Sequence, residues 1–160
     1  MRLVTRTIIV ALVAGCGLTG VSCGAAPPPL RLHADVKQIM AAIVDPAADV
    51  VWGAVGTIDT IEGTEQIRPR DEGEWTETAH AAWVVTEAAN ALMIGNRPKD
   101  TGDWMKFAQD LADNGLKAAR AAEAHDADAL FTAGGDMYLA CTACHAKYNV
   151  TLTAAAPVTQ

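Results

Sequence analysis

Two cysteines and a histidine near the C-terminal end of the chain stand in the order Cys141-Thr142-Ala143-Cys144-His145. This CxxCH spacing is that of the attachment sequence for a c-type haem. Two thiols three residues apart lie on one face of a helix, where both reach the vinyl groups of one porphyrin and form thioethers. The adjacent imidazole then reaches the iron as the proximal ligand. The motif therefore predicts one covalent haem c, held by Cys141, Cys144 and His145.

The same two thiols have three other known uses in proteins, which are a redox dithiol, half of a zinc site and a plain disulfide. A thioredoxin-like dithiol belongs to a βαβ unit, and this chain shows no alternation of strands and helices. A zinc site needs two more ligands, and none of His33, His80 and His125 lies in a second cysteine or histidine cluster. Haem attachment is therefore the favoured interpretation.

The elements that must position the motif are helices. From Leu30 onward, apolar residues recur at helical spacing in four blocks that glycine, proline and charged clusters separate. These blocks predict helices over residues 32–55, 74–94, 101–124 and from 127 to about 148. The first helix is expected to be kinked or broken at Asp45-Pro46, because proline has no amide hydrogen to donate. The polar stretch over 57–73 predicts a loop, with a small hairpin around Gly63.

The last helix is expected to carry the motif on its inward face. A series of residues at spacings of three and four forms a seam that includes both cysteines: Leu130, Gly134, Met137, Cys141, Cys144 and Tyr148. Helices of this length with short connections predict an all-α fold, an antiparallel four-helix bundle with a covalently attached haem near the C-terminal end of the last helix. Small residues on these helices could leave room for a large flat group.

The N-terminal residues are typical of an export signal. Arg2 and Arg6 precede a short apolar stretch over 7–13, which is too short to span a bilayer. The next residues, Val13-Ala14-Gly15-Cys16, match a bacterial lipobox. The sequence therefore predicts a lipoprotein-type signal peptide over residues 1–15 and an exported, periplasmic chain.

Cys16 is the predicted lipid attachment site, where acyl chains would hold the protein at the membrane surface. Cleavage of an ordinary secretory signal near Ala26 is the alternative, and Cys23 is a weaker second lipobox candidate. The rest of the chain is expected to form a proline-rich tether, a four-helix domain and a flexible tail, over residues 16–30, 31–150 and 151–160.

Composition and charge exclude several classes of protein. The 160 residues are 51% apolar and 19% charged, which is too apolar for a disordered chain. The formal charge is -7, and removal of residues 1–15 with their two arginines changes it to -9. Such a chain lacks the basic surface that nucleic acid binding requires. Redox partner proteins with basic patches are the expected partners.

The CxxCHxxY segment over 141–148 resembles that of the class II c-type cytochromes, which are cytochrome c′ and its low-spin relatives. These are four-helix bundles with the haem motif near the end of the last helix, followed by a basic and aromatic pair such as Lys147-Tyr148. The resemblance covers about residues 32–148. The Asp45-Pro46 interruption and the long polar loop depart from the continuous first helix of the family.

The resemblance implies that the first helix supplies the residue on the distal side of the haem. That residue is a methionine in low-spin electron carriers and a non-ligating apolar residue in five-coordinate members. Met40 stands at the matching place, and its thioether would complete the His/Met ligand set that raises the haem potential. An ordinary core role for Met40 stays open. So does a bis-histidine site through His33, seven residues earlier on the same face.

The expected function is therefore that of a periplasmic or membrane-tethered c-type cytochrome that transfers electrons, rather than an enzyme. The alternative is a five-coordinate haem protein that binds NO or CO as a sensor or scavenger. A peroxidase-like enzyme is disfavoured, because the sequence shows no distal His/Arg pair at helical spacing. Many members of the family dimerise through their first two helices, so a homodimer is a further expectation that stays open.

Overall fold

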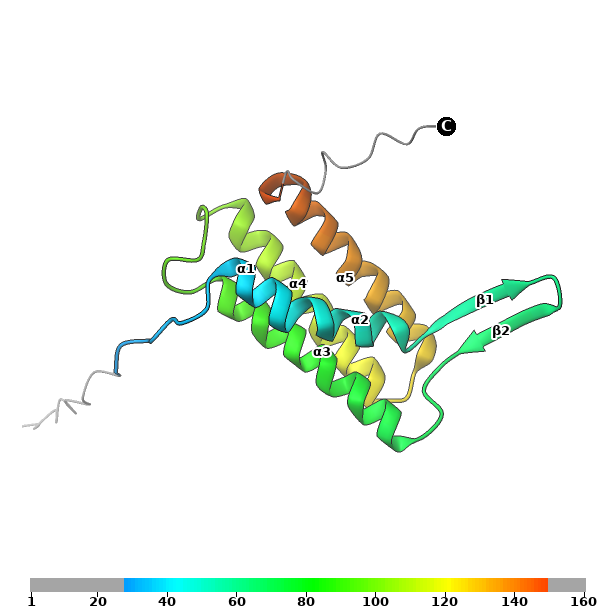
Figure 1. The fold of residues 1–160 in the computed structure, drawn as a ribbon. Coiled ribbons are helices and arrows are strands. Elements are labelled where there is room, and N and C mark those ends of the chain that lie inside the picture. The colour runs from blue at the N-terminus through cyan, green and yellow to red at the C-terminus, as the bar shows by residue number, and fades with distance from the viewer. Residues whose placement is uncertain (1–27, 150–160) are drawn as a thin grey trace, which may run out of the picture.

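The computed structural model describes residues 28–149 and shows a mostly helical fold (Figure 1). In chain order the elements are α1 (Val36–Ile39), the π-helix η1 (Met40–Val44), α2 (Asp45–Gly53), β1 (Gly56–Thr60), β2 (Gly63–Ile67), α3 (Glu72–Leu92), α4 (Asp103–Glu123) and α5 (Ala127–Tyr148). The predicted signal peptide, Cys16, Cys23 and the tail over 151–160 lie outside the described residues. No helix within residues 28–149 is long and apolar enough to cross a membrane.

Aspartate is the N-cap residue of three of the helices. Each accepts a hydrogen bond from an amide in the first turn, at 2.8 to 3.0 Å: Asp35 from Gln38 at α1, Asp71 from Glu74 at α3 and Asp126 from Ala129 at α5. These carboxylates satisfy amides that have no partner within the helix itself. The caps explain where the chain enters each helix.

The first helix runs without a break from α1 through η1 to α2. Within η1 the amide of Asp45 donates to the carbonyl of Met40, so this turn holds one residue more than an α-helical turn. Pro46 follows at the start of α2. Pro46 has no amide hydrogen to donate, and its ring would clash with the carbonyl of the preceding turn in a regular α-helix. The wider turn of η1 shifts the hydrogen-bond pattern just before Pro46, and the helix continues through it. A break at Asp45-Pro46 was one of the two predicted forms of this helix, and that form is wrong.

The hairpin predicted around Gly63 is confirmed. β1 and β2 pair antiparallel in a register that runs from Gly56 opposite Ile67 to Thr60 opposite Gly63. Gly63 has a φ of +143°, a conformation that favours glycine. The Thr60 hydroxyl donates to the carbonyl of Gly63 at 3.1 Å and accepts from the amide of Glu62 at 3.1 Å. These bonds fix the turn at the tip of the hairpin.

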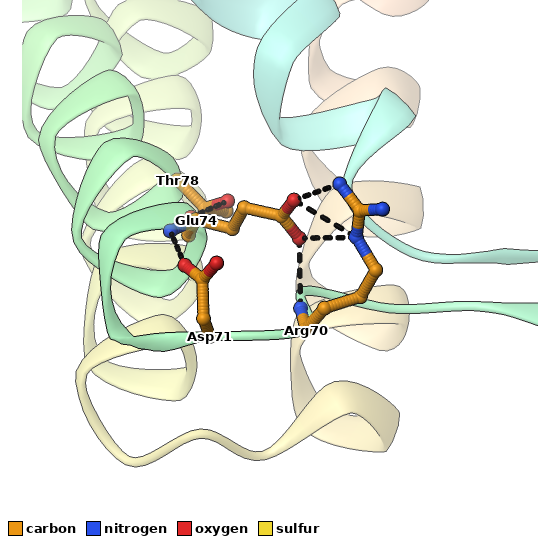
Figure 2. Close-up of polar contacts among 4 residues, drawn as sticks. All are labelled: Arg70, Asp71, Glu74 and Thr78. Atoms are coloured by element: carbon orange, nitrogen blue, oxygen red, sulfur yellow. Dashed lines mark hydrogen bonds and ion pairs between the residues drawn. The ribbon is translucent and has the colours of Figure 1, made fainter.

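Figure 2 shows how the chain passes from the hairpin into α3. Glu74 accepts from the backbone amide of Arg70 at 2.7 Å and from its Nε at 2.9 Å, and also pairs with its guanidinium. Asp71 caps the helix, and the Thr78 hydroxyl donates to the carbonyl of Glu74 at 2.8 Å. The base of the hairpin is therefore attached to the first turn of α3 by several polar contacts.

The three long helices pack in chain order, α3 against α4 and α4 against α5, while the first helix packs on α3 and touches α5 through α2 (Figure 1). The largest fully buried side chains come from four of these helical elements: Ile39, Val51, Val85, Leu130 and Met137. Leu130, Gly134 and Met137 are buried, and Cys141, Cys144 and Tyr148 are partly buried. The predicted inward face of the last helix is therefore confirmed.

Gly115 of α4 allows close approach to α3, and its replacement tests this packing. A methyl group at Gly115 would lie 2.6 Å from Oγ1 and 3.2 Å from the amide nitrogen of Thr86. We expect Gly115→Ala to lower the free energy of unfolding by about 1–3 kcal/mol. Gly135→Ala is the control, because its methyl group meets nothing within 4 Å. It should stabilise the helix by about 0.5–1 kcal/mol. Urea unfolding measures both, and equal stability of the two variants would contradict the packing.

Candidate functional site

The two motif cysteines lie one turn apart on α5 and are both free thiols. Each is partly buried, and Cys141 packs against the hydrophobic core. Met137, one turn before Cys141 on the same face, is fully buried. The helix therefore presents both sulfur atoms on the side that faces the other helices.

His145 shares this side of α5. Over residues 141–148 a partly buried set, made of Cys141, Cys144, His145 and Tyr148, alternates with an exposed set, made of Thr142, Ala143, Ala146 and Lys147. The carbonyl of His145 accepts from the amide of Asn149 at 2.9 Å, which places the histidine in the final turn of the helix. Helical periodicity thus brings two thiols and one imidazole onto a single face.

Burial changes the acid–base properties of both thiols. It raises the pKa of Cys141 from 9.0 to about 11, with a further contribution from the neighbouring Cys144 thiol. Burial also raises the pKa of Cys144. A redox dithiol requires the reverse, because the thiolate is the attacking group and a lowered pKa is what activates it. The environment therefore does not favour the redox dithiol interpretation.

The last turn of α5 is attached to the start of α4. Nζ of Lys147 lies 2.6 Å from a carboxylate oxygen of Asp103, and the hydroxyl of Tyr148 donates to Asp100. The ring of Tyr148 also packs edge-on against Trp104, with 5.1 Å between the ring centroids. Lys147 and Tyr148, which make these three contacts, come shortly after His145 in the chain. The contacts therefore restrain the end of the helix that carries His145.

The contact between Tyr148 and Asp100 gives a pH-dependent prediction. The phenol hydroxyl is the main reason that the pKa of Asp100 lies below its ordinary 3.8. A lowered carboxylate pKa contributes stability above the ordinary value, and this stability is lost as the pH falls through the lowered value. We expect Tyr148→Phe to reduce the free energy of unfolding at neutral pH, and this loss to become smaller as the pH falls below 3.8. Urea unfolding at neutral and at acidic pH measures this, and an equal loss throughout would contradict the assignment.

Met40 and His33, the two candidates for the distal side, differ in their surroundings. Met40 is the first residue of η1, is partly buried and packs against the core. His33 is exposed and precedes α1. Met40 thus packs on the inner side of the first helix, whereas His33 does not pack there. Ligation of iron by either residue stays a prediction.

The first helix meets α5 through a contact that involves Trp52 of α2. Its indole Nε1 donates to the carbonyl of Gly134 at 3.0 Å, and its ring lies edge-on to Tyr138 with 5.8 Å between centroids. Beyond this contact the C-terminal half of α5 diverges from α1 and η1 (Figure 1). The motif therefore lies in the part of α5 that is separated from the first helix.

The remaining histidines form no second ligand cluster. His80 is exposed, and His125 stacks on Trp75 with 5.0 Å between ring centroids and lies 3.4 Å from a carboxylate oxygen of Glu72. Across residues 28–149 no three side chains of His, Cys, Asp or Glu gather as a group that could hold a metal ion. A zinc site at Cys141 and Cys144 therefore finds no further ligands within this part of the chain.

The donor set fits a covalent haem. Two unpaired thiols one turn apart and an adjacent imidazole, all on one helix face, are the groups that thioether attachment and axial ligation require. Two surface cavities of about 550 and 370 Å³ lie elsewhere, one lined by α4 and α5 and one by α3, the end of α4 and the α4–α5 connection. Neither is lined by a residue of the motif.

Several residues that take part in the contacts of α5 had no signal in the sequence. Asp100, Asp103 and Tyr138 lie in no recognisable motif, and the first two reach their partners across 48 and 44 positions of the chain. The packing of α4 against α5 brings Asp100 and Asp103 to their partners, and Tyr138 meets Trp52 where α2 contacts α5. Comparison of the chain with protein-family models, with curated proteins and with solved structures found no match.

Proposed function

We propose that this protein is an exported c-type cytochrome, which transfers electrons through one haem bound by Cys141, Cys144 and His145. The observation that carries the proposal is the alignment of two free thiols and the adjacent imidazole on the inward face of α5. When bound, the haem would supply an iron that changes between the ferric and ferrous states. The likeness of this segment to class II c-type cytochromes is part of the same proposal.

The fold proposed for this function is an antiparallel four-helix bundle, in which α1, η1 and α2 together count as the first helix. Supporting this are the packing of α3, α4 and α5 in chain order and the contacts of the first helix with α3 and α5. Bundles of this kind hold cofactors with side chains on facing helices. Met40 is the residue of the first helix that we propose as the sixth ligand.

The residues of the chain would have separate roles at this site. Cys141 and Cys144 would hold the porphyrin through two thioethers, so that it would stay attached when the fold opens. His145 would supply a ring nitrogen to the iron. Lys147 and Tyr148, through their contacts with Asp103 and Asp100, restrain the turn that carries this imidazole. Their contribution is to orientation rather than to electron transfer itself.

The charge of the chain supports encounters with basic redox partners. After removal of residues 1–15 the formal charge would be -9, which attracts proteins with basic patches at low salt. The lipobox ending at Cys16 supports a lipoprotein anchored at the periplasmic face of a membrane. Such an anchor would limit the search for a partner to the membrane surface.

A gas-binding haem protein is the second candidate function. The observation that favours it is the packing of Met40 against the core, because an ordinary apolar side chain on the first helix would make the same contact. If Met40 does not bind iron, one axial position stays open to NO or CO.

Absorption spectra distinguish the two functions. The protein is produced in a host with a c-haem maturation system, and ferric and ferrous spectra are recorded with and without CO. Electron transfer predicts sharp, low-spin ferrous bands that CO does not change. A broad high-spin spectrum that sharpens with CO would overturn electron transfer in favour of gas binding. Absence of any haem spectrum would overturn both proposals.

A further inference from the structure

The hairpin formed by β1 and β2 extends away from the helices (Figure 1). Apart from Gly56 at its base, every residue of both strands is exposed, and Ile61 at the tip is about as accessible as in an extended chain, at 103%. No strand residue belongs to the hydrophobic core. The hairpin therefore takes no part in the hydrophobic core of the helical body.

Folding alone does not explain this element. A two-stranded hairpin without a packed face is only marginally stable in water, and helices in compact domains are usually joined by two to eight residues. Here the segment between α2 and α3 spans residues 54–71. Its base is attached to α3 by Arg70, Asp71 and Glu74 (Figure 2), so the hairpin is held in place at one end.

The two faces and the edges of the hairpin offer distinct contacts. The strand register places Ile58 and Ile67 on one face as diagonal neighbours across the two strands, and both are exposed. Thr57, Asp59 and their partners on β2 form the opposite, polar face. The hairpin is a two-stranded sheet with no third strand among residues 28–149, so the outer edge of each strand is open. Open edges accept a further strand through backbone hydrogen bonds.

The charge of the hairpin selects the kind of strand that it can accept. Asp59, Glu62 and Glu65 are its only charged residues, and residues 56–67 contain no lysine or arginine. Pairing with the hairpin of a second copy would bring the acidic side chains of the two copies together. Charged residues on an exposed strand edge oppose such edge-to-edge pairing. A strand that carries lysine or arginine would instead meet opposite charges.

We infer that this hairpin is a docking element, which accepts a basic extended segment of a partner protein at its open edge. The segment would alternate basic and apolar residues, with its basic side chains on the face that Glu65 shares with Ile58 and Ile67. Their apolar stems would then cover the isoleucines while their charged ends meet Glu65. In Figure 1 the hairpin lies at the opposite end of the body from the end of α5 that carries the motif. The inference goes beyond electron transfer, and it does not require haem.

The test uses the synthetic peptide acetyl-Lys-Val-Lys-Val-Lys-Val-amide and the full protein as purified from a periplasmic expression host. Binding is followed through the backbone amide chemical shifts of the labelled protein. We expect saturable shift changes centred on residues 56–67. A peptide with glutamate in place of lysine should bind at least fivefold more weakly. So should a lysine peptide whose alternate amides are methylated, because it cannot pair with an edge.

The matched variants change charge at two places. Glu62→Lys combined with Glu65→Lys alters the hairpin, and neither side chain makes a hydrogen bond that the turn needs. Asp49→Lys combined with Asp113→Lys changes the net charge equally on exposed positions of α2 and α4. The first pair should weaken binding at least fivefold, and the second should leave it within twofold. Equal effects of both pairs, shift changes spread over the helices or no binding at millimolar peptide would overturn the inference. Unchanged haem spectra in the hairpin variant keep this result separate from that of the proposed function.

Discussion

Replacing both Cys141 and Cys144 by alanine is expected to abolish covalent haem attachment, from about one haem per chain to none. Both thiols lie on the inward face of α5, and each would form one thioether. Without either bond nothing but axial ligation would hold the porphyrin, and denaturation would release it. Peroxidase staining of the denatured protein after gel electrophoresis measures this, because only covalently attached haem stays with the chain.

Single variants and a control refine the result. Cys141→Ala or Cys144→Ala should each leave one thioether and therefore some stain. Cys23→Ala removes a thiol outside the motif and should leave haem attachment unchanged. A double variant that still retained haem after denaturation would refute the assignment of these two residues. A loss of stain in all the variants, including Cys23→Ala, would point to a defect in export or maturation.

Met40→Ala is expected to change the electronic state of the iron. Loss of a thioether ligand would open one axial position, so the ferrous spectrum should become high-spin and respond to CO. The reduction potential should fall by roughly 0.1 V or more, a fraction of the ~0.8 V range that axial ligands cover. Absorption spectroscopy and redox titration measure the two changes.

Met105→Ala is the matched control for Met40→Ala. Both methionines are partly buried and pack against the core, so both replacements remove a similar amount of packing. Urea unfolding should show comparable losses of stability, whereas only Met40→Ala should change the spectrum. If both variants kept the wild-type spectrum, Met40 would be a core residue. His33→Ala would then test whether the exposed histidine supplies the ligand instead.

The helices were predictable from sequence because their signals are local. Apolar spacing located all four helical regions, and their observed ends differ from the prediction by a few residues. α3 begins two residues earlier than predicted, since Asp71 rather than a residue nearer Glu74 caps it. The π-helical turn before Pro46 was not predictable. A pattern analysis based on 3.6 residues per turn cannot distinguish a kink, a break and a wider turn at a proline.

Part of the candidate site was likewise predictable from neighbouring residues, and part depends on contacts between helices that are far apart in the sequence. Cys141, Cys144 and His145 are adjacent in sequence, so helical periodicity alone placed them on one face. The contacts of Lys147 with Asp103 and of Trp52 with Tyr138 depend on how α5 packs against α4 and α2. The sequence also did not predict that the hairpin extends away from the helices. Gly63 indicated the turn, but no residue indicated that the strands would lack contact with the helical core.

Covalent attachment of haem to the CxxCH motif of α5 can be tested by measuring the mass of the wild-type protein. The protein is purified from a host with a c-haem maturation system, denatured, and measured intact and after proteolysis. We expect the chain to carry the mass of one haem, with the added mass on the peptide that contains Cys141 and Cys144. A chain without added mass, whose two motif thiols can be alkylated or form a disulfide, would contradict it.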